Sequence, residues 1–166
     1  MRGKADRIDT TAHGRVLVSD YKTGKPDRYT KLREDQFREG TTLQLGMYSE
    51  GALQSSFGES VSAHYAMVDT AEVARFGYEW TSDLRSRFDE VLGAIIDGIE
   101  GGVFASAPGE WSSFLQTNEA CTYCDYDSVC PRERGEQAEA KAHNSEVQIR
   151  LRLQPPVAPS ADEVES

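Results

Sequence analysis

The sequence of 166 residues lacks several features that define common protein classes. No apolar run approaches the roughly 18 residues of a membrane-spanning helix, which excludes a membrane protein. Residues 1–4 are not followed by the apolar stretch of a signal peptide, so we expect a cytoplasmic protein. No phosphate loop of the GxxxxGKS or GxxxxGKT type occurs, which excludes a recognisable nucleotide-driven motor. We expect no disulfides among the three cysteines of such a chain.

Basic residues are in the minority, because 18 Lys and Arg stand against 28 Asp and Glu, for a net charge of −10. This balance argues weakly against a nucleic-acid partner, since phosphate binders usually present a basic face. Residues 21–38 are different, with six basic and three acidic residues and therefore a local charge of +3. On its own, such a run is most simply a solvated loop. Its basic residues are Lys22, Lys25, Arg28, Lys31, Arg33 and Arg38.

The order of elements predicts an α/β fold with a mixed central sheet flanked by helices. The hydrophobic content of 38% is typical of a globular domain. Threonine in the stretch Gly40–Thr42 is a candidate N-cap for the first helix, and Ser82 for the second. A short exposed helix over 132–142 and a disordered acidic tail from Leu153 are expected to follow. Strands are predicted over 4–9, 15–22, 61–68 and 73–80, and long helices from about 42 to 57 and from 82 to 99.

Asp20 and Lys22 are two residues apart on a predicted strand, so their side chains point to the same face. If the preceding turn is centred near His13, residues whose numbers sum to about 26 lie opposite each other. Asp6 then faces Asp20. Two carboxylates suit Mg²⁺, which is commonly held by one or two carboxylates and keeps several waters. Alone, the D-x-K pattern often occurs by chance and is more simply a surface ion pair.

This grouping contains the parts needed for phosphodiester hydrolysis. A bound metal ion lowers the pKa of its water and polarises a phosphoryl oxygen. The Lys22 ammonium is suited to position the attacking hydroxide or to neutralise charge in the transition state.

Two segments in order, Gly3-Lys4-Ala5-Asp6-Arg7-Ile8-Asp9 and Val16-Leu17-Val18-Ser19-Asp20-Tyr21-Lys22-Thr23-Gly24, resemble the PD-(D/E)XK nuclease signature. More narrowly, they resemble the nuclease domains of the bacterial RecB/AddB/AdnAB helicase–nucleases. The resemblance implies a restriction-endonuclease-like fold. It also implies that Asp6, Asp20 and the Tyr21 carbonyl bind Mg²⁺ or Mn²⁺, that Lys22 is the catalytic lysine, and that Asp9 is structural.

Gln44 and Tyr48 lie four residues apart and share a helix face. Their simplest interpretation is a partly polar core helix, with Tyr48 packed and Gln44 exposed. The family, however, has a Q-x-x-x-Y motif after D-x-K that borders the active site and the DNA, and the resemblance assigns Gln44 and Tyr48 to it. The basic run then lines the approach of single-stranded DNA through Lys25, Arg28, Lys31, Arg33 and Arg38.

All three cysteines fall within ten residues, as Cys121, Cys124 and Cys130, which favours metal binding over chance clustering. Zinc and a [4Fe–4S] cluster each need four ligands. His143 is a candidate fourth ligand for zinc, although a solvated surface histidine is the simpler interpretation. The resemblance favours the iron–sulfur cluster, because such family members carry C-x₂-C-x₅-C after the nuclease core and their fourth cysteine far upstream.

We therefore expect a nuclease core over 1–110, an iron–sulfur segment over 111–135, and a polar helix with a tail over 136–166. Because the first motif begins at Gly3, the chain is expected to be the C-terminal piece of a longer protein or to have a truncated start. The resemblance implies a Mg²⁺-dependent DNA exonuclease that acts with a helicase in double-strand-break repair. The alternatives are an exonuclease of CRISPR adaptation, a non-catalytic DNA-binding scaffold, and a small zinc-binding interaction protein.

Overall fold

A computed structural model describes residues 3–55, 57–68, 74–104, 106–145 and 147–155. By its contacts the chain forms two compact units, one of residues up to Gly93 with those from Leu153 onward, and one of Ala94–Arg152. In these described ranges no helix is long and apolar enough to cross a membrane. The expected acidic tail lies almost wholly outside the described residues.

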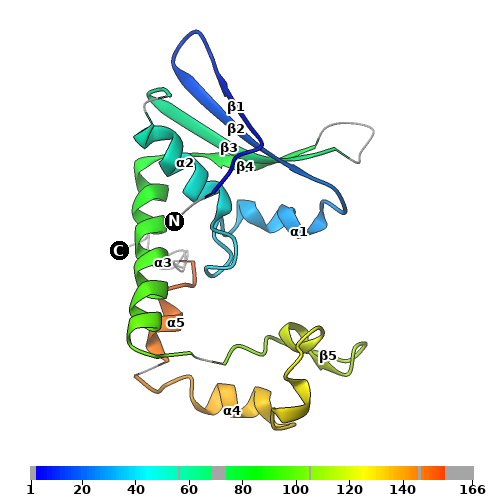
Figure 1. Cartoon of the computed structure of the whole chain (residues 1–166). Helices are drawn as coiled ribbons and strands as arrows, with labels where there is room; N and C mark the ends of the chain where they lie inside the picture. The colour runs from blue at the N-terminus through cyan, green and yellow to red at the C-terminus, as the bar shows by residue number, and fades with distance from the viewer. Residues whose placement is uncertain (1–2, 56, 69–73, 105, 146, 156–166) are drawn as a thin grey trace, which may run out of the picture. The chain divides into compact units, whose positions relative to one another are not determined.

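The first unit contains a four-stranded sheet in the order β1-β2-β3-β4 (Figure 1). The β1–β2 and β3–β4 pairs are antiparallel, whereas β2 and β3 are parallel. The sheet is therefore mixed, and the predicted fold class is confirmed. Its strands are β1 (Arg7–Thr10), β2 (Arg15–Lys22), β3 (Ser60–Met67) and β4 (Arg75–Glu79).

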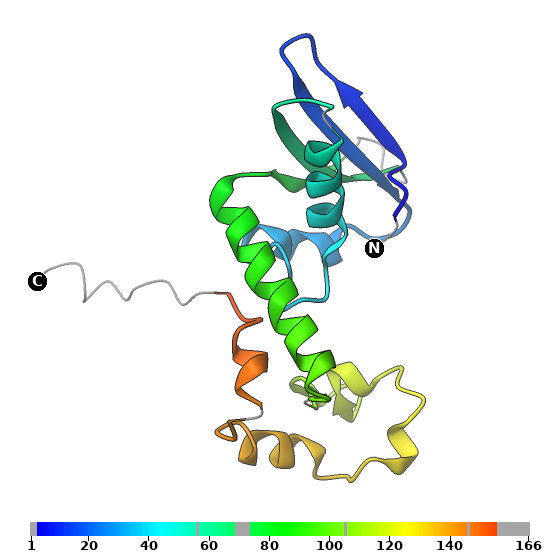
Figure 2. The same ribbon diagram turned by 60° about the vertical axis from the view of Figure 1, so that its left-hand side comes forward.

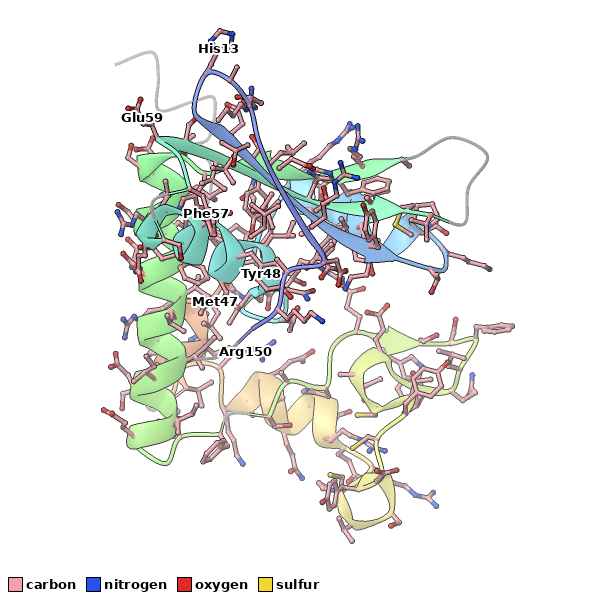
Figure 3. All side chains as sticks on the ribbon, turned by 45° about the horizontal axis from the view of Figure 1, so that its top comes forward. His13, Met47, Tyr48, Phe57, Glu59 and Arg150 are labelled. Carbon is pink, nitrogen blue, oxygen red and sulfur yellow. The ribbon has the colours of Figure 1, made fainter. Side chains whose placement is uncertain are left out.

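The β1–β2 hairpin has the predicted register, because Arg7 pairs with Ser19 and Thr10 with Val16, and each pair sums to 26. His13 lies at the tip of this hairpin (Figure 3). Gly14 closes the turn at φ 73°, in the left-handed region that glycine occupies without strain. The first strand begins at Arg7, three residues later than predicted, so Asp6 immediately precedes it.

The core lies on the sheet face that carries the even-numbered residues of β2. Val16 and Val18 are fully buried there, and helix α2 (Gln44–Gln54) contributes the fully buried Leu45. Helix α3 (Ser82–Glu100) contributes Phe88, whose ring centroid lies 5.4 Å from those of both Phe37 and Trp80. Figure 2 shows α2 and the first half of α3 beside the sheet. Burial of these apolar side chains stabilises the unit that positions the candidate site.

The helix starts differ from the predicted ones. The predicted threonine N-cap of the first long helix is wrong, because α2 begins after Leu43 without a side-chain cap. The second helix begins at the predicted Ser82, but its cap is Thr81, whose hydroxyl accepts a 3.2 Å hydrogen bond from the Leu84 N–H. It ends at Glu100, one residue after the predicted end, and the pair Gly101 and Gly102 follows.

The basic run, which alone suggested a solvated loop, contains helix α1 (Asp27–Thr30) and a 3₁₀ turn, η1 (Lys31–Arg33). Tyr29 and Leu32 explain this difference. They are three residues apart and buried to 9% and 3% exposure, so the segment has an apolar side that packs on the unit.

The second unit is mostly exposed. It contains the two-residue strands β5 (Trp111–Ser112) and β6 (Thr117–Asn118) and the 3₁₀ turns η2 (Glu119–Cys121) and η3 (Asp127–Val129). Its helices are α4 (Arg134–Ala140) and α5 (Gln148–Leu151). The exposed α4 confirms the short helix predicted near 132–142.

Candidate active site

Asp20, near the end of β2, is a buried carboxylate with only 3% of its surface exposed. Its Oδ1 accepts a 2.9 Å hydrogen bond from the Gln44 side-chain amide. Its Oδ2 forms an ion pair with the Lys22 ammonium but has no hydrogen-bond partner among the described residues. The Lys22 ammonium compensates the charge of this buried oxygen, and a bound cation would add a ligand contact to it.

Lys22 is oriented by three neighbours. Its ammonium forms the ion pair with Asp20 and donates a 3.2 Å hydrogen bond to Gln44 Oε1. It also lies 5.1 Å from the ring centroid of Tyr65, close enough for a cation–π contact. Tyr65 pairs with Asp20 across β2 and β3. This contact could not be predicted, because strand partners far apart in the chain are not visible in local sequence patterns.

Gln44 and Tyr48 share one face of α2, as their spacing predicted. The Gln44 amide donates to both Asp20 and the Tyr48 hydroxyl, the latter at 2.9 Å, while its oxygen accepts from Lys22. Both of its N–H groups and its oxygen are therefore used. The Tyr48 hydroxyl in turn donates a 2.7 Å hydrogen bond to the Lys4 carbonyl, so α2 holds the segment that leads into β1. Figure 3 shows Tyr48 beside that segment.

Asp6 is exposed, and its Oδ2 accepts a 2.9 Å hydrogen bond from the Tyr21 backbone N–H. The structure thus places Asp6 against the end of β2, beside the residue that follows Asp20. Asp9 is half-buried and forms a 2.7 Å ion pair with Arg7. The hydrogen bond from Arg7 holds the pKa of Asp9 below its usual value. This pairing is compatible with the structural role expected for Asp9.

Asp6 and Asp20 suit a hard divalent cation. In the part of the chain that the structure describes, no group of three or more His, Cys, Asp or Glu residues could hold a metal ion. Mg²⁺ needs fewer, since it commonly uses one or two carboxylates and retains water ligands. Asp20 Oδ2, which has no hydrogen bond among the described residues, is a carboxylate oxygen available as a metal ligand. The carboxylates therefore fit Mg²⁺ or Mn²⁺.

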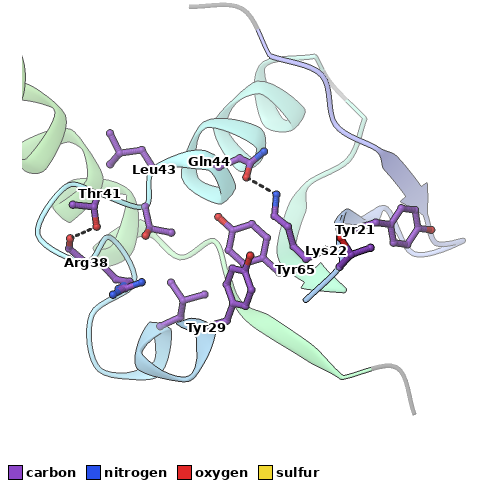
Figure 4. Close-up of a pocket in the computed structure, with 11 residues that line it drawn as sticks. Tyr21, Lys22, Tyr29, Arg38, Thr41, Leu43, Gln44 and Tyr65 are labelled. Atoms are coloured by element: carbon purple, nitrogen blue, oxygen red, sulfur yellow. Dashed lines mark hydrogen bonds between the residues drawn. The ribbon is translucent and has the colours of Figure 1, made fainter. Parts of the chain in front are cut away.

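The described basic residues of segment 21–38 are not brought together at the candidate active site. Lys25, Lys31 and Arg33 are exposed, and the side chain of Arg28 lies outside what the structure describes. Arg38 differs from the others, because it is half-buried and lines a cavity of about 490 Å³ next to Lys22 and Gln44 (Figure 4). The sequence predicted the positive charge of this segment, but it did not predict that Arg38 is half-buried beside Lys22 and Gln44.

The three cysteines lie in the second unit. Cys121 is half-buried, and Cys124 and Cys130 are exposed. The Cys124 N–H donates a 3.2 Å hydrogen bond to the Cys121 carbonyl, so the C-x-x-C part forms a turn. Within the described residues the three thiols do not form a group that could hold a metal. In this arrangement they do not fit an iron–sulfur cluster, and they lack a fourth cysteine.

The protein has an α/β fold whose mixed sheet carries an aspartate–lysine pair and, beside it, a second aspartate. This combination is suited to phosphodiester chemistry. A family model of the PD-(D/E)XK nuclease superfamily matches residues 1–131, and the chain belongs to this superfamily. The match confirms the resemblance at the superfamily level, whereas the RecB/AddB/AdnAB branch stays a prediction. Searches of curated proteins and of solved structures found no match.

Proposed function

We propose that this protein is a Mg²⁺-dependent DNA nuclease that hydrolyses phosphodiester bonds. The observation that carries the proposal is the buried Asp20 carboxylate, which Gln44 orients beside the Lys22 ammonium. A surface ion pair, the alternative interpretation of D-x-K, would leave both side chains largely in water. Here the side chains of Asp20 and Lys22 are only 4% and 27% exposed. Membership of the nuclease superfamily supports the same conclusion.

In this proposal Asp6 and Asp20 supply the oxygen ligands, together with the Tyr21 carbonyl. The metal ion, when bound, lowers the pKa of a water molecule and polarises the phosphoryl oxygen. Lys22 provides a partly desolvated positive charge next to the site, where charge develops on the phosphate. Gln44 keeps Asp20 and Lys22 in position through its amide. Tyr48 supports Gln44 and anchors the segment that carries Asp6.

The finer proposal is an exonuclease that acts with a helicase on DNA ends during double-strand-break repair. Its support is the form of the motifs, D-Y-K-T-G after a G-x-A-D-R-I-D opening, and the trio of cysteines that follows the nuclease core. The cysteines would supply three of the four thiolates of a [4Fe–4S] cluster only if their loop rearranged to bring the sulfurs together.

The test is degradation of end-labelled single-stranded DNA with Mg²⁺ or Mn²⁺ by the wild type, Asp20→Asn and the matched control Asp9→Asn. We expect Asp20→Asn to lower the rate by about a hundredfold or more. Asp9→Asn should stay near the wild-type rate, because its exposed partner Arg7 can turn to water. Equal rates for the three proteins would reject the site. A wild type that binds DNA but never cleaves it would favour the scaffold alternative.

Linear and circular single-stranded DNA of the same sequence separate the two modes of cleavage. An exonuclease degrades the linear form and leaves the circle intact. Cleavage of the circle at a similar rate would contradict the exonuclease proposal while leaving the nuclease itself in place.

A further inference from the structure

A cavity of about 490 Å³ opens beside the candidate active site and is separate from the two carboxylates. Lys22 and Gln44 form the wall that it shares with the site. The opposite wall is formed by α1 and by the loop that precedes α2, as Figure 4 shows. Its volume is in the range of pockets that enclose small organic ligands, about 300–1,000 Å³.

Two tyrosines give this cavity an aromatic lining. The rings of Tyr29 and Tyr65 lie 4.8 Å apart between centroids, inclined by 44°, and Phe76 packs 6.3 Å from Tyr29. Tyr29 and Tyr65 are 9% and 3% exposed, so they are held rigidly by the surrounding core. An aromatic surface beside a cationic site is suited to the base or sugar of a nucleotide.

The loop that carries Arg38 has an unusual backbone. Arg38 and Glu39 have φ values of 45° and 52°, and Gly40 follows at 83°. Left-handed conformations in two successive non-glycine residues cost free energy and persist only where surrounding contacts enforce them. Conformations of this kind concentrate at ligand-binding sites.

Hydrogen bonds hold this loop in place. The Asp35 carboxylate accepts from the Phe37 N–H at 3.0 Å and from the Glu39 N–H at 2.7 Å. The Arg38 carbonyl accepts from both the N–H and the hydroxyl of Thr41, at 3.1 and 2.7 Å. The strained backbone is thus fixed on both sides of Arg38, and the side chain is presented to the cavity rather than left on a mobile loop.

We propose that this cavity binds one nucleotide of single-stranded DNA adjacent to the scissile phosphate, with Arg38 contacting that nucleotide's phosphate and the Tyr29–Tyr65 surface contacting its sugar or base. The inference rests on the proposed nuclease function and names a substrate subsite for it. Arg38 belongs to a segment of charge +3 in a chain of charge −10, which favours a phosphate there. A base reaches into this open cavity only when it is unstacked and unpaired, which selects single strands over duplex.

The test is equilibrium binding of a fluorescein-labelled oligothymidylate by anisotropy, in EDTA so that no cleavage occurs. Arg38→Gly is the decisive variant, because glycine keeps the left-handed backbone without strain while the side chain is lost. Lys141→Ala is the matched control, since Lys141 is an exposed basic residue outside the basic run and does not line the cavity. Thermal melting establishes that both variants are folded.

We expect Arg38→Gly to weaken binding at least tenfold and to lower the slope of log K against log salt by about 1. Lys141→Ala should weaken it less than threefold. Equal effects of the two variants, or tighter binding of a duplex of the same length, would overturn the subsite. If the wild type cleaves DNA in an Asp20-dependent manner while Arg38→Gly binds and cleaves normally, only this inference fails. If the wild type neither binds nor cleaves, both proposals fail.

Discussion

Replacing Gln44 by alanine tests whether one amide organises the candidate site. This side chain donates to Asp20 and Tyr48 and accepts from Lys22, so the variant loses three hydrogen bonds. The bond to Asp20 is the most costly to lose, because it leaves the remaining oxygen of a 3% exposed carboxylate without a hydrogen bond.

The magnitude follows from the environment of each bond. A hydrogen bond to a charged group contributes about 1.5–3 kcal/mol, and one between neutral groups about 1 kcal/mol. The Lys22 side chain is 27% exposed and can bond to water, so its share of the loss is small. Gln44→Ala should therefore lower the free energy of unfolding by about 2–4 kcal/mol.

Urea denaturation measures this change, with Gln54→Ala as the matched control. Gln54 is also a glutamine of α2, but it is exposed and bonds only locally, to Glu50 at 3.0 Å. We expect Gln54→Ala to stay within about 0.5 kcal/mol of the wild type. If the two variants lost equal stability, the amide would not be holding the buried carboxylate, and the arrangement described here would be wrong.

Four further predictions concern stability and metal content. Burial lowers the pKa of His64 from its usual 6.5, so the folded state binds fewer protons than the unfolded chain and stability is lost as the pH falls below about 6.5. His64→Gln should flatten the acid side of a Tm-against-pH profile, and an unchanged profile would contradict this. Gly51→Ala, where a Cβ meets nothing within 4 Å on α2, should stabilise by about 0.5–1 kcal/mol in urea denaturation. Gly77→Ala should destabilise by about 2 kcal/mol or more in the same assay, because its Cβ would overlap the Ala63 carbonyl oxygen, and tolerance of this change would refute the packing. If the cluster forms, the wild type purified anaerobically should contain iron and the Cys124→Ser variant should not. Iron-free wild-type protein of unchanged stability would reject the iron–sulfur cluster.

The sequence by itself determined the features that depend on local spacing. The alternation of side chains placed Asp20 and Lys22 on one face, and a turn near His13 set the register of the β1–β2 pair, in which Arg7 faces Ser19. The spacing of apolar residues and a following Gly-Gly pair located α3 almost to its ends. These features involve neighbours within a few residues or across one short turn, so their geometry is set by strand and helix periodicity.

Only the tertiary structure decided which residues surround Asp20 and Lys22. The parallel pairing of β2 with β3 joins segments about forty residues apart and brings Tyr65 beneath Lys22, a register that no local pattern encodes. The helical turns at Tyr29 and Leu32 form because both side chains are buried, although the same segment is rich in charge. The left-handed backbone at Arg38 is enforced by bonds from Asp35 and Thr41. In each case the deciding free energy comes from contacts with distant or buried groups, which propensity and spacing do not contain.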